Sequence, residues 1–346
     1  MKAKLARPIS EGRGAQRASG FGARRLPSGS SPWALLPTMI LLAACGSTGL
    51  VVGSNDGGVG SASPSASVEP LETGPFDPQD VWLVFGVATG KEAGIHAVRS
   101  DGSRLHRLPL PAPASSPSFS ADRRFMAYAG SRGISVLNLA TGTSKGLTNG
   151  PDGAPAWAPS GEYIAFTRGL DIRLVRSDGS GERPFIEGPP PGTAASERYT
   201  NPQFTGDSLS VMFGLPGAID VGRIDGSGFL RLFEPSLGKP FATPSPDRTE
   251  LVVSVQCLPP STQLIVVQTN ALSRVCEVGR RVESLPTVDR AVLGANGLVA
   301  YYSYGYSIRV VPAAGGTPVT LVDTRVALGG GTVAGVAWTL PGTILP

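Results

Sequence analysis

Short runs of large apolar residues alternate with small and polar residues along most of the chain. Apolar stretches such as 163–166, 209–213 and 298–302 are separated by Gly, Pro, Asp and Ser. No long stretch places apolar residues at the i, i+3, i+4 and i+7 positions of an amphipathic helix. Both features are typical of an all-β protein with many turns.

One boundary between two strands recurs. The segment "PAWAPSGEYIAF" at 155–166 combines an aromatic residue, a Pro-Ser-Gly turn and an apolar strand, and we call it a corner. Related corners are "PSFSADRRFMAY" at 117–128, "PQFTGDSLSVMF" at 202–213 and "ATPSPDRTELVV" at 242–253, with weaker copies from Val292 and from Val336. The corner is therefore a repeated unit.

Each corner is followed by a second apolar strand and a tight turn. Asp-Gly pairs at 101–102, 178–179 and 225–226 supply the turn conformation that a two-residue hairpin needs. The corners recur about every 38–49 residues, the period of a four-stranded propeller blade. The pattern predicts an all-β fold, a six-bladed β-propeller of four-stranded antiparallel blades over residues 79–346. We call the four strands of a blade A to D.

The two ends of the propeller region are incomplete in complementary ways. Residues 81–110 supply strands B, C and D without a corner, and residues 336–345 supply a strand A and a corner with nothing after it. We expect the N-terminal strands to pair with the C-terminal strand in one blade. Closure of this kind removes exposed sheet edges.

The repeat resembles that of a known family. The pattern P-x-W-[ST]-P-[DS]-G-x-x-[IL]-A-[FY], followed by I-x-x-V-x-x-D-G, is similar to the TolB-like (WD-repeat-like) propeller repeats of bacterial envelope proteins. Trp157 and its turn match this pattern apart from Ala158, whereas the copies near 244 and 293 lack the aromatic residue. The resemblance implies a six-bladed propeller in the cell envelope, but it implies no particular function.

Residues 1–45 have the features of an export signal. Seven basic residues precede the apolar run 33–44, which is too short to span a bilayer but suits a signal peptide. Leu42-Ala43-Ala44-Cys45 resembles the lipobox of bacterial lipoproteins, which implies lipidation of Cys45. The resemblance predicts a lipid anchor on the extracytoplasmic side of a bacterial membrane. An ordinary signal peptide and a buried core cysteine are the alternatives.

Residues 46–78 are rich in Gly, Ser and Pro, which predicts a flexible linker between the anchor and the propeller. Without residues 1–45 the chain has 23 basic and 25 acidic residues. A chain this close to neutral has no electrostatic reason to bind nucleic acid, so the basic pI of the whole sequence is misleading. We expect a monomer without a cofactor.

Cysteine usage agrees with export. Apart from Cys45, the chain contains Cys257 and Cys276, which we expect to pair as a disulfide in an oxidising compartment. Two separate buried thiols are the alternative. Neither cysteine has a His or a second Cys at zinc-binding spacing, so we expect no metal site.

The propeller topology places the A–B corners and C–D turns on one face and the B–C and D–A loops on the other. We expect the binding site on the second face, because its loops vary most. The candidate residues are Tyr301, Tyr304, Tyr306, Arg280, Arg281 and Arg325. Ordinary strand packing and solvated surface charge are the alternatives. A wider basic rim on this face would add Lys91, Arg132, Arg168, Arg198 and Lys239.

The sequence contains no recognisable catalytic motif. His96 and His106, the only histidines, fall on predicted strands and are expected to be packing residues. These observations predict a membrane-tethered, non-catalytic module that binds an envelope protein or a glycan. The alternative is a hydrolase or lyase that acts on a cell-wall or extracellular polymer, with Asp220 and Glu197 as candidate channel carboxylates.

Overall fold

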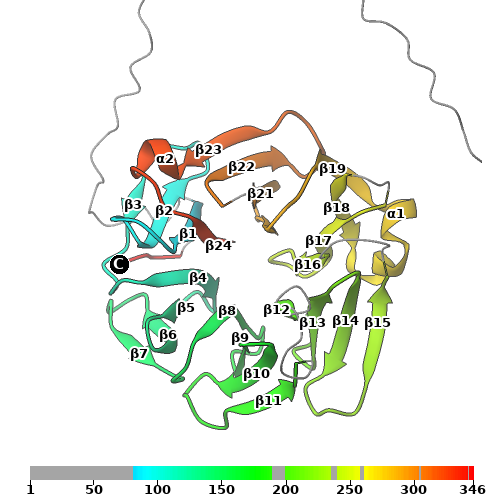
Figure 1. The fold of residues 1–346 in the computed structure, drawn as a ribbon, viewed down its shortest axis with the longest axis horizontal. Helices are drawn as coiled ribbons and strands as arrows, with labels where there is room; N and C mark the ends of the chain where they lie inside the picture. Colours follow the sequence, from blue (N-terminus) through cyan, green and yellow to red (C-terminus); the bar gives the residue numbers. More distant parts are fainter. Residues whose placement is uncertain (1–80, 189–198, 235–239, 258–260, 304, 342) are drawn as a thin grey trace, which may run out of the picture. The chain divides into compact units, whose positions relative to one another are not determined.

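The computed structural model describes residues 81–188, 199–234, 240–257, 261–303, 305–341 and 343–346. In this part of the chain the strands form six antiparallel sheets of four strands each, arranged as blades around a centre (Figure 1). The six-bladed propeller fold predicted from the corners is therefore confirmed. The predicted signal peptide, Cys45 and the linker lie outside the described residues.

We number the blades in chain order. Blade 1 contains β24 (Val333–Trp338), β1 (Trp82–Val87), β2 (Gly94–Arg99) and β3 (His106–Arg107). Blade 2 contains β4 (Ala114–Phe119), β5 (Phe125–Gly130), β6 (Gly133–Asn138) and β7 (Ser144–Gly146). Blade 3 contains β8 (Asp152–Trp157), β9 (Tyr163–Arg168), β10 (Asp171–Arg176) and β11 (Arg183–Ile186).

The second half of the ring has the same order. Blade 4 contains β12 (Thr200–Phe204), β13 (Ser210–Leu215), β14 (Ala218–Arg223) and β15 (Phe229–Phe233). Blade 5 contains β16 (Phe241–Pro244), β17 (Glu250–Val255), β18 (Thr262–Gln268) and β19 (Arg280–Leu285). Blade 6 contains β20 (Arg290–Leu293), β21 (Leu298–Ser303), β22 (Ser307–Pro312) and β23 (Val319–Asp323). The described residues also include the helical segments η2 (Thr269–Arg274), α1 (Val275–Val278) and α2 (Thr324–Ala327).

Blade 1 joins the two ends of the described chain. Strand β24 pairs with β1, so that Trp338 lies opposite Leu83 and Val336 lies opposite Phe85. Beyond this ladder, the amide of Thr339 donates to the carbonyl of Trp82 at 2.9 Å. Both long edges of β1 are thereby paired.

The corners owe their shape to a hydroxyl residue and an aspartate two positions later. In three corners the hydroxyl donates to that carboxylate and accepts the amide of the following strand; the pairs are Ser120–Asp122, Thr205–Asp207 and Ser245–Asp247. The residue after each aspartate has a positive φ, and these residues are Arg123, Ser208 and Arg248. The repeated sequence motif is therefore a locally satisfied hydrogen-bonded turn.

Most of the core lies between the faces of adjacent blades. In β21, Val299 and Tyr301 pack in a cluster with residues of blade 5, whereas Ala300 and Tyr302 pack in a cluster with residues of blade 1. All four residues are buried. Both faces of a second strand such as β21 are covered by the two neighbouring blades, which explains its continuous apolar sequence. His96 and His106 are also buried in blade 1.

Blade 5 departs from the repeat between its third and fourth strands. The segments η2 and α1 occupy this connection, and Leu272 and Val275 are buried in a cluster that includes Met212 and Ile219 of blade 4. A disulfide joins Cys276 in α1 to Cys257 after β17, as the sequence predicts, with the two Cα atoms 5.4 Å apart. None of the helices in the described part of the chain has the length and apolar character needed to span a bilayer.

Candidate functional site

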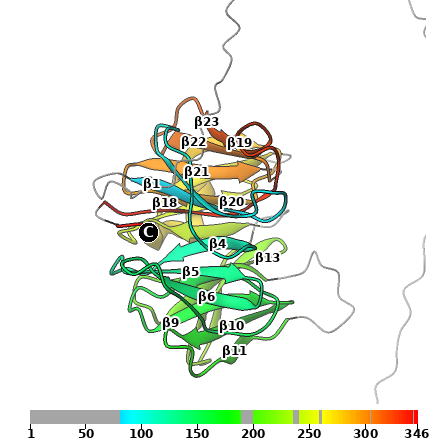
Figure 2. The ribbon, with the colours of Figure 1, turned by 90° about the vertical axis from the view of Figure 1, so that its left-hand side faces the viewer.

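The strands run through the thickness of the ring, so the connections gather on its two sides (Figure 2). On one side lie the B–C and D–A connections, which we call the B–C/D–A face. On this face, the start of β12, the end of β17, the start of β18 and the segments before β16 and β20 line a cavity of about 330 Å³. Its polar lining includes Thr200, Asn201, Ser254, Gln256, Thr287 and Asp289. We call it the blade 4–6 cavity.

Arg290 lies beside this cavity at the start of β20, the inner strand of blade 6. Its Nη1 donates to Oδ1 of Asn201 on β12, the inner strand of blade 4, at 3.2 Å. Because blade 5 lies between these two strands in the ring, the arginine side chain reaches across the inner end of blade 5. Asn201 therefore belongs both to the cavity wall and to the arginine contact.

The charge of Arg290 has no carboxylate partner in the described part of the chain. The residue is 7% exposed, and among the described residues no acid forms an ion pair with its guanidinium. Its Nε has no hydrogen-bond partner in the described structure, and the same is true of Oε1 of Gln256 in the cavity wall. Burial lowers the pKa of the Arg290 guanidinium. Most buried polar atoms have a hydrogen-bond partner, so these two atoms are positions that a bound water or a ligand group can fill.

Two of the predicted site residues meet on the same face. The guanidinium of Arg325, in α2, lies over the ring of Tyr306 at 5.5 Å, and Tyr306 is 38% exposed. Asp323 holds Arg325 through an ion pair of 2.7 Å, which lowers the pKa of the Asp323 carboxyl and raises that of Arg325. The B–C loop and the D–A connection of blade 6 thus present an aromatic–cation pair to solvent.

The prediction for Tyr301 is wrong. Its side chain is fully buried, and its hydroxyl donates to Oε2 of Glu283 at 2.9 Å. Burial and this carboxylate raise the pKa of Tyr301. The tyrosine is a packing residue because both faces of β21 are covered by neighbouring blades. Tyr304 lies outside the described residues.

The placement of Arg280 and Arg281 is also wrong. Both residues belong to β19 rather than to a loop, since η2 and α1 occupy the connection before it. Arg280 contacts Glu250 after an A–B corner and the carbonyl of Ala313 in a C–D turn. The carbonyl of Arg281 lies near Gly315 in the same turn. These arginines therefore lie towards the A–B/C–D face.

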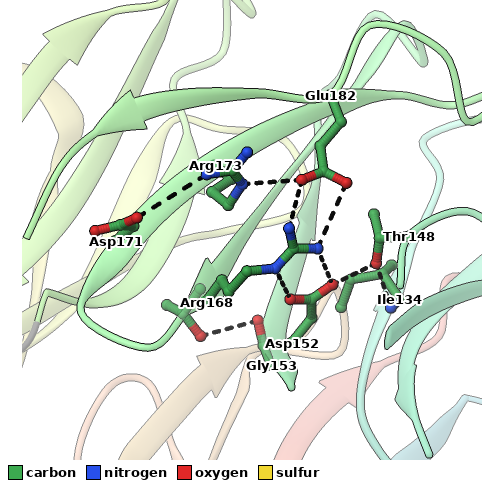
Figure 3. Close-up of polar contacts among 9 residues, drawn as sticks. Ile134, Thr148, Asp152, Gly153, Arg168, Asp171, Arg173 and Glu182 are labelled. Atoms are coloured by element: carbon green, nitrogen blue, oxygen red, sulfur yellow. Dashed lines mark hydrogen bonds and ion pairs between the residues drawn. The ribbon is translucent and has the colours of Figure 1, made fainter. Parts of the chain in front are cut away.

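Arg168 does not contribute a free charge to a basic rim. Its Nε and Nη2 donate to the buried carboxylate of Asp152 at 2.6 and 2.8 Å, and its Nη1 donates to Glu182 at 2.6 Å (Figure 3). The hydroxyl of Thr148 also donates to Asp152, and Arg173 donates to Glu182. The two acids raise the pKa of the Arg168 guanidinium. This cluster neutralises itself and serves the packing of blade 3.

Asp220 does not lie on an inner strand beside the central channel, as the hydrolase alternative requires. This residue lies on β14, the third strand of blade 4, and accepts from Arg231 of the outer strand at 2.9 Å. Glu197, Arg198 and Lys239 lie outside the described residues. Within the described part of the chain, no three His, Cys, Asp or Glu side chains gather in a way that could hold a metal ion.

Sequence reasoning missed Arg290 and Asn201. The signal that could have found them is an arginine directly before the apolar "AVL" of the sixth inner strand. A charged residue on an inner strand lies near the ring centre, where it needs a polar partner from another blade or a ligand. The contact with Asn201, 89 positions away, has no local sequence signature.

The described residues form a six-bladed β-propeller. A chain in the structure of a nidogen/laminin complex superposes with a TM-score of 0.59 at 13% identity, covering 75% of this chain and 99% of that chain. TolB from Acinetobacter baumannii gives a TM-score of 0.59 at 16% identity, covering 75% of this chain and 66% of TolB. No protein-family model and no curated protein sequence matches the chain. At these identities the likeness concerns the fold alone.

Proposed function

We propose that this protein is a non-catalytic binding propeller of the bacterial cell envelope, and that its ligand docks on the B–C/D–A face. The observation that carries the proposal is the blade 4–6 cavity, where three blades contribute polar groups to one concave site. Concave sites with a few convergent polar groups are the usual places for ligands. The exposed Tyr306–Arg325 pair extends the same face with a residue combination common at protein interfaces.

The ligand class that we propose is an envelope protein or a glycan. The envelope location rests on the sequence "LAAC" before and at Cys45 and on the resemblance of the repeats to TolB-like propellers. A lipid on Cys45 would hold the propeller near a membrane, with residues 46–78 as the tether. The hydrolase alternative needs a pair of catalytic carboxylates. Asp220 is not available for such a pair, because it accepts from Arg231 on the outer strand of its blade.

The docking face can be tested by crosslinking in cells. We expect the Tyr306→Ala/Arg325→Ala variant of the full chain to capture at least about tenfold less partner, because exposed aromatic and arginine side chains often dominate binding. The matched control is Leu230→Ala/Arg281→Ala, which removes an exposed apolar residue and an exposed arginine elsewhere. Equal capture by the docking variant and the wild type would contradict the proposed face.

The anchor can be tested by cell fractionation. We expect the wild-type chain in the membrane fraction and the Cys45→Ala variant in the soluble fraction, since the thiol that would carry the lipid is gone. Ser47→Ala, two positions away, should stay with the membrane. Membrane retention of Cys45→Ala would contradict lipid anchoring at this residue.

A further inference from the structure

Among the described residues, Arg290 is a buried cation without an acidic partner. Transfer of a guanidinium from water to a protein interior is unfavourable unless a carboxylate or a similar anion is placed beside it. Asn201 supplies one neutral acceptor to Nη1, and Nε remains without a partner. Because no described acid balances the charge of Arg290, an anionic ligand that binds beside it would supply the missing counter-ion.

The surroundings of Arg290 suit a carboxylate. Tyr302 lies directly opposite Arg290 in the β20–β21 ladder, so the two side chains share one face of the sheet. The Tyr302 hydroxyl accepts from the amide of Gly335 at 3.1 Å, which leaves its own proton available for donation. Burial raises the pKa of Tyr302, so the hydroxyl stays protonated. Arg290 Nε and the Tyr302 O–H are thus two donors on the same side of this sheet, and a carboxylate can accept from both kinds of donor.

The cavity beside this position suits a peptide. Among the described residues, its lining contains no aromatic ring on which a sugar could stack, and it includes the apolar groups of Pro240, Val255, Pro286 and Val288. Strands β12, β16 and β20 each end their sheet, so one edge of each has no strand partner among the described residues. Such edges present backbone donors and acceptors that an extended peptide can use.

We propose that the blade 4–6 cavity binds a peptide segment and that Arg290 pairs with a carboxylate of this segment, with Asn201 and Tyr302 orienting the pair. This inference specifies the ligand of the docking face and therefore rests on the proposed function. The carboxylate is either the peptide C-terminus or an Asp or Glu side chain, and both sources offer the same bidentate partner to the guanidinium.

The experiment is a titration of the full ¹⁵N-labelled chain, observed at the Arg Nε–H resonances. The probes are N-acetyl-Gly-Gly-Gly with a free carboxylate, its C-terminal amide, N-acetyl-Asp amide and glucuronate. The resonance of Arg290 is identified by its loss in Arg290→Gln, and Arg281→Gln serves as the control for an exposed arginine. We expect at least one of the two peptide carboxylates to shift the Arg290 signal saturably. The uncharged amide should bind at least about tenfold more weakly, the usual effect of losing a charged hydrogen-bond partner.

Equal effects of the free acid and the amide, or no shift of the Arg290 signal by either peptide carboxylate, would overturn the inference. A shift by glucuronate alone would replace the peptide with an acidic glycan. Should Arg290→Gln fail to fold, Arg290→Lys identifies the resonance, and the comparison of acid with amide on the wild type decides the result. Crosslinking that depends on Tyr306 and Arg325 would stand even if all four probes failed, so the two proposals can be separated.

Discussion

We expect Arg168→Met to lower the free energy of unfolding by about 3–5 kcal/mol, the usual cost of leaving one member of a buried ion pair alone. The carboxylate of Asp152 is fully buried and receives two hydrogen bonds from Arg168. Methionine has a similar length but provides no donor, so Asp152 would keep only the hydroxyl of Thr148. Urea denaturation of the wild type and the variant measures the difference.

The matched control for this prediction is Arg231→Met. Arg231 also pairs with a carboxylate, that of Asp220, but its side chain is 48% exposed. Water screens such a pair, so its loss should have a small effect compared with the loss of Arg168. The double variant Arg168→Met/Asp152→Asn should recover part of the stability, because it removes the buried charge that the single variant leaves behind. Equal losses for Arg168→Met and Arg231→Met would show that the cluster is not a buried ion pair.

The second large effect concerns the disulfide of blade 5. We expect Cys257→Ser/Cys276→Ser to lose about 3 kcal/mol of stability, the loop-entropy value for a closed loop of this size. The bond joins positions 19 residues apart and ties α1 to the end of β17. Strand β19 follows α1 directly, so the loss should appear first as faster hydrogen exchange in β19.

Chemical denaturation with and without a reducing agent measures this effect. The reducing agent should lower the midpoint of the wild type and leave the double serine variant unchanged. An equal midpoint for the oxidised wild type and the variant would mean that the disulfide adds no stability. A midpoint of the wild type that does not respond to reduction, together with two free thiols after unfolding, would mean that the bond is not formed.

The number and internal order of the blades follow from local sequence. A corner such as 117–128 works through hydrogen bonds between Ser120, Asp122 and Phe125, all within six positions of one another. Positive-φ residues and Asp-Gly turns act over the same short range. Local chemistry of this kind leaves a readable pattern in the chain, so the six four-stranded antiparallel blades were predictable.

The roles of individual side chains depended on which blades meet. The sequence pattern predicted a surface position for Tyr301. In the closed ring, however, β21 is the second strand of blade 6 and is covered on both faces by the neighbouring blades. Arg280 read as a loop residue because the helical segment 269–278 between two strands gave no periodic signal. Tyr306 and Arg325 were placed on the correct loops, since B–C and D–A connections follow directly from strand order.

By itself, the sequence determined the propeller and the position of each corner, and it predicted the pairing of Cys257 with Cys276. Only the tertiary structure decided that Arg290 reaches Asn201 and that no described carboxylate balances its charge. The physical reason is distance along the chain. Turns and corners depend on neighbours a few residues apart, whereas the ring centre brings together inner strands whose relative positions depend on the packing of every blade between them.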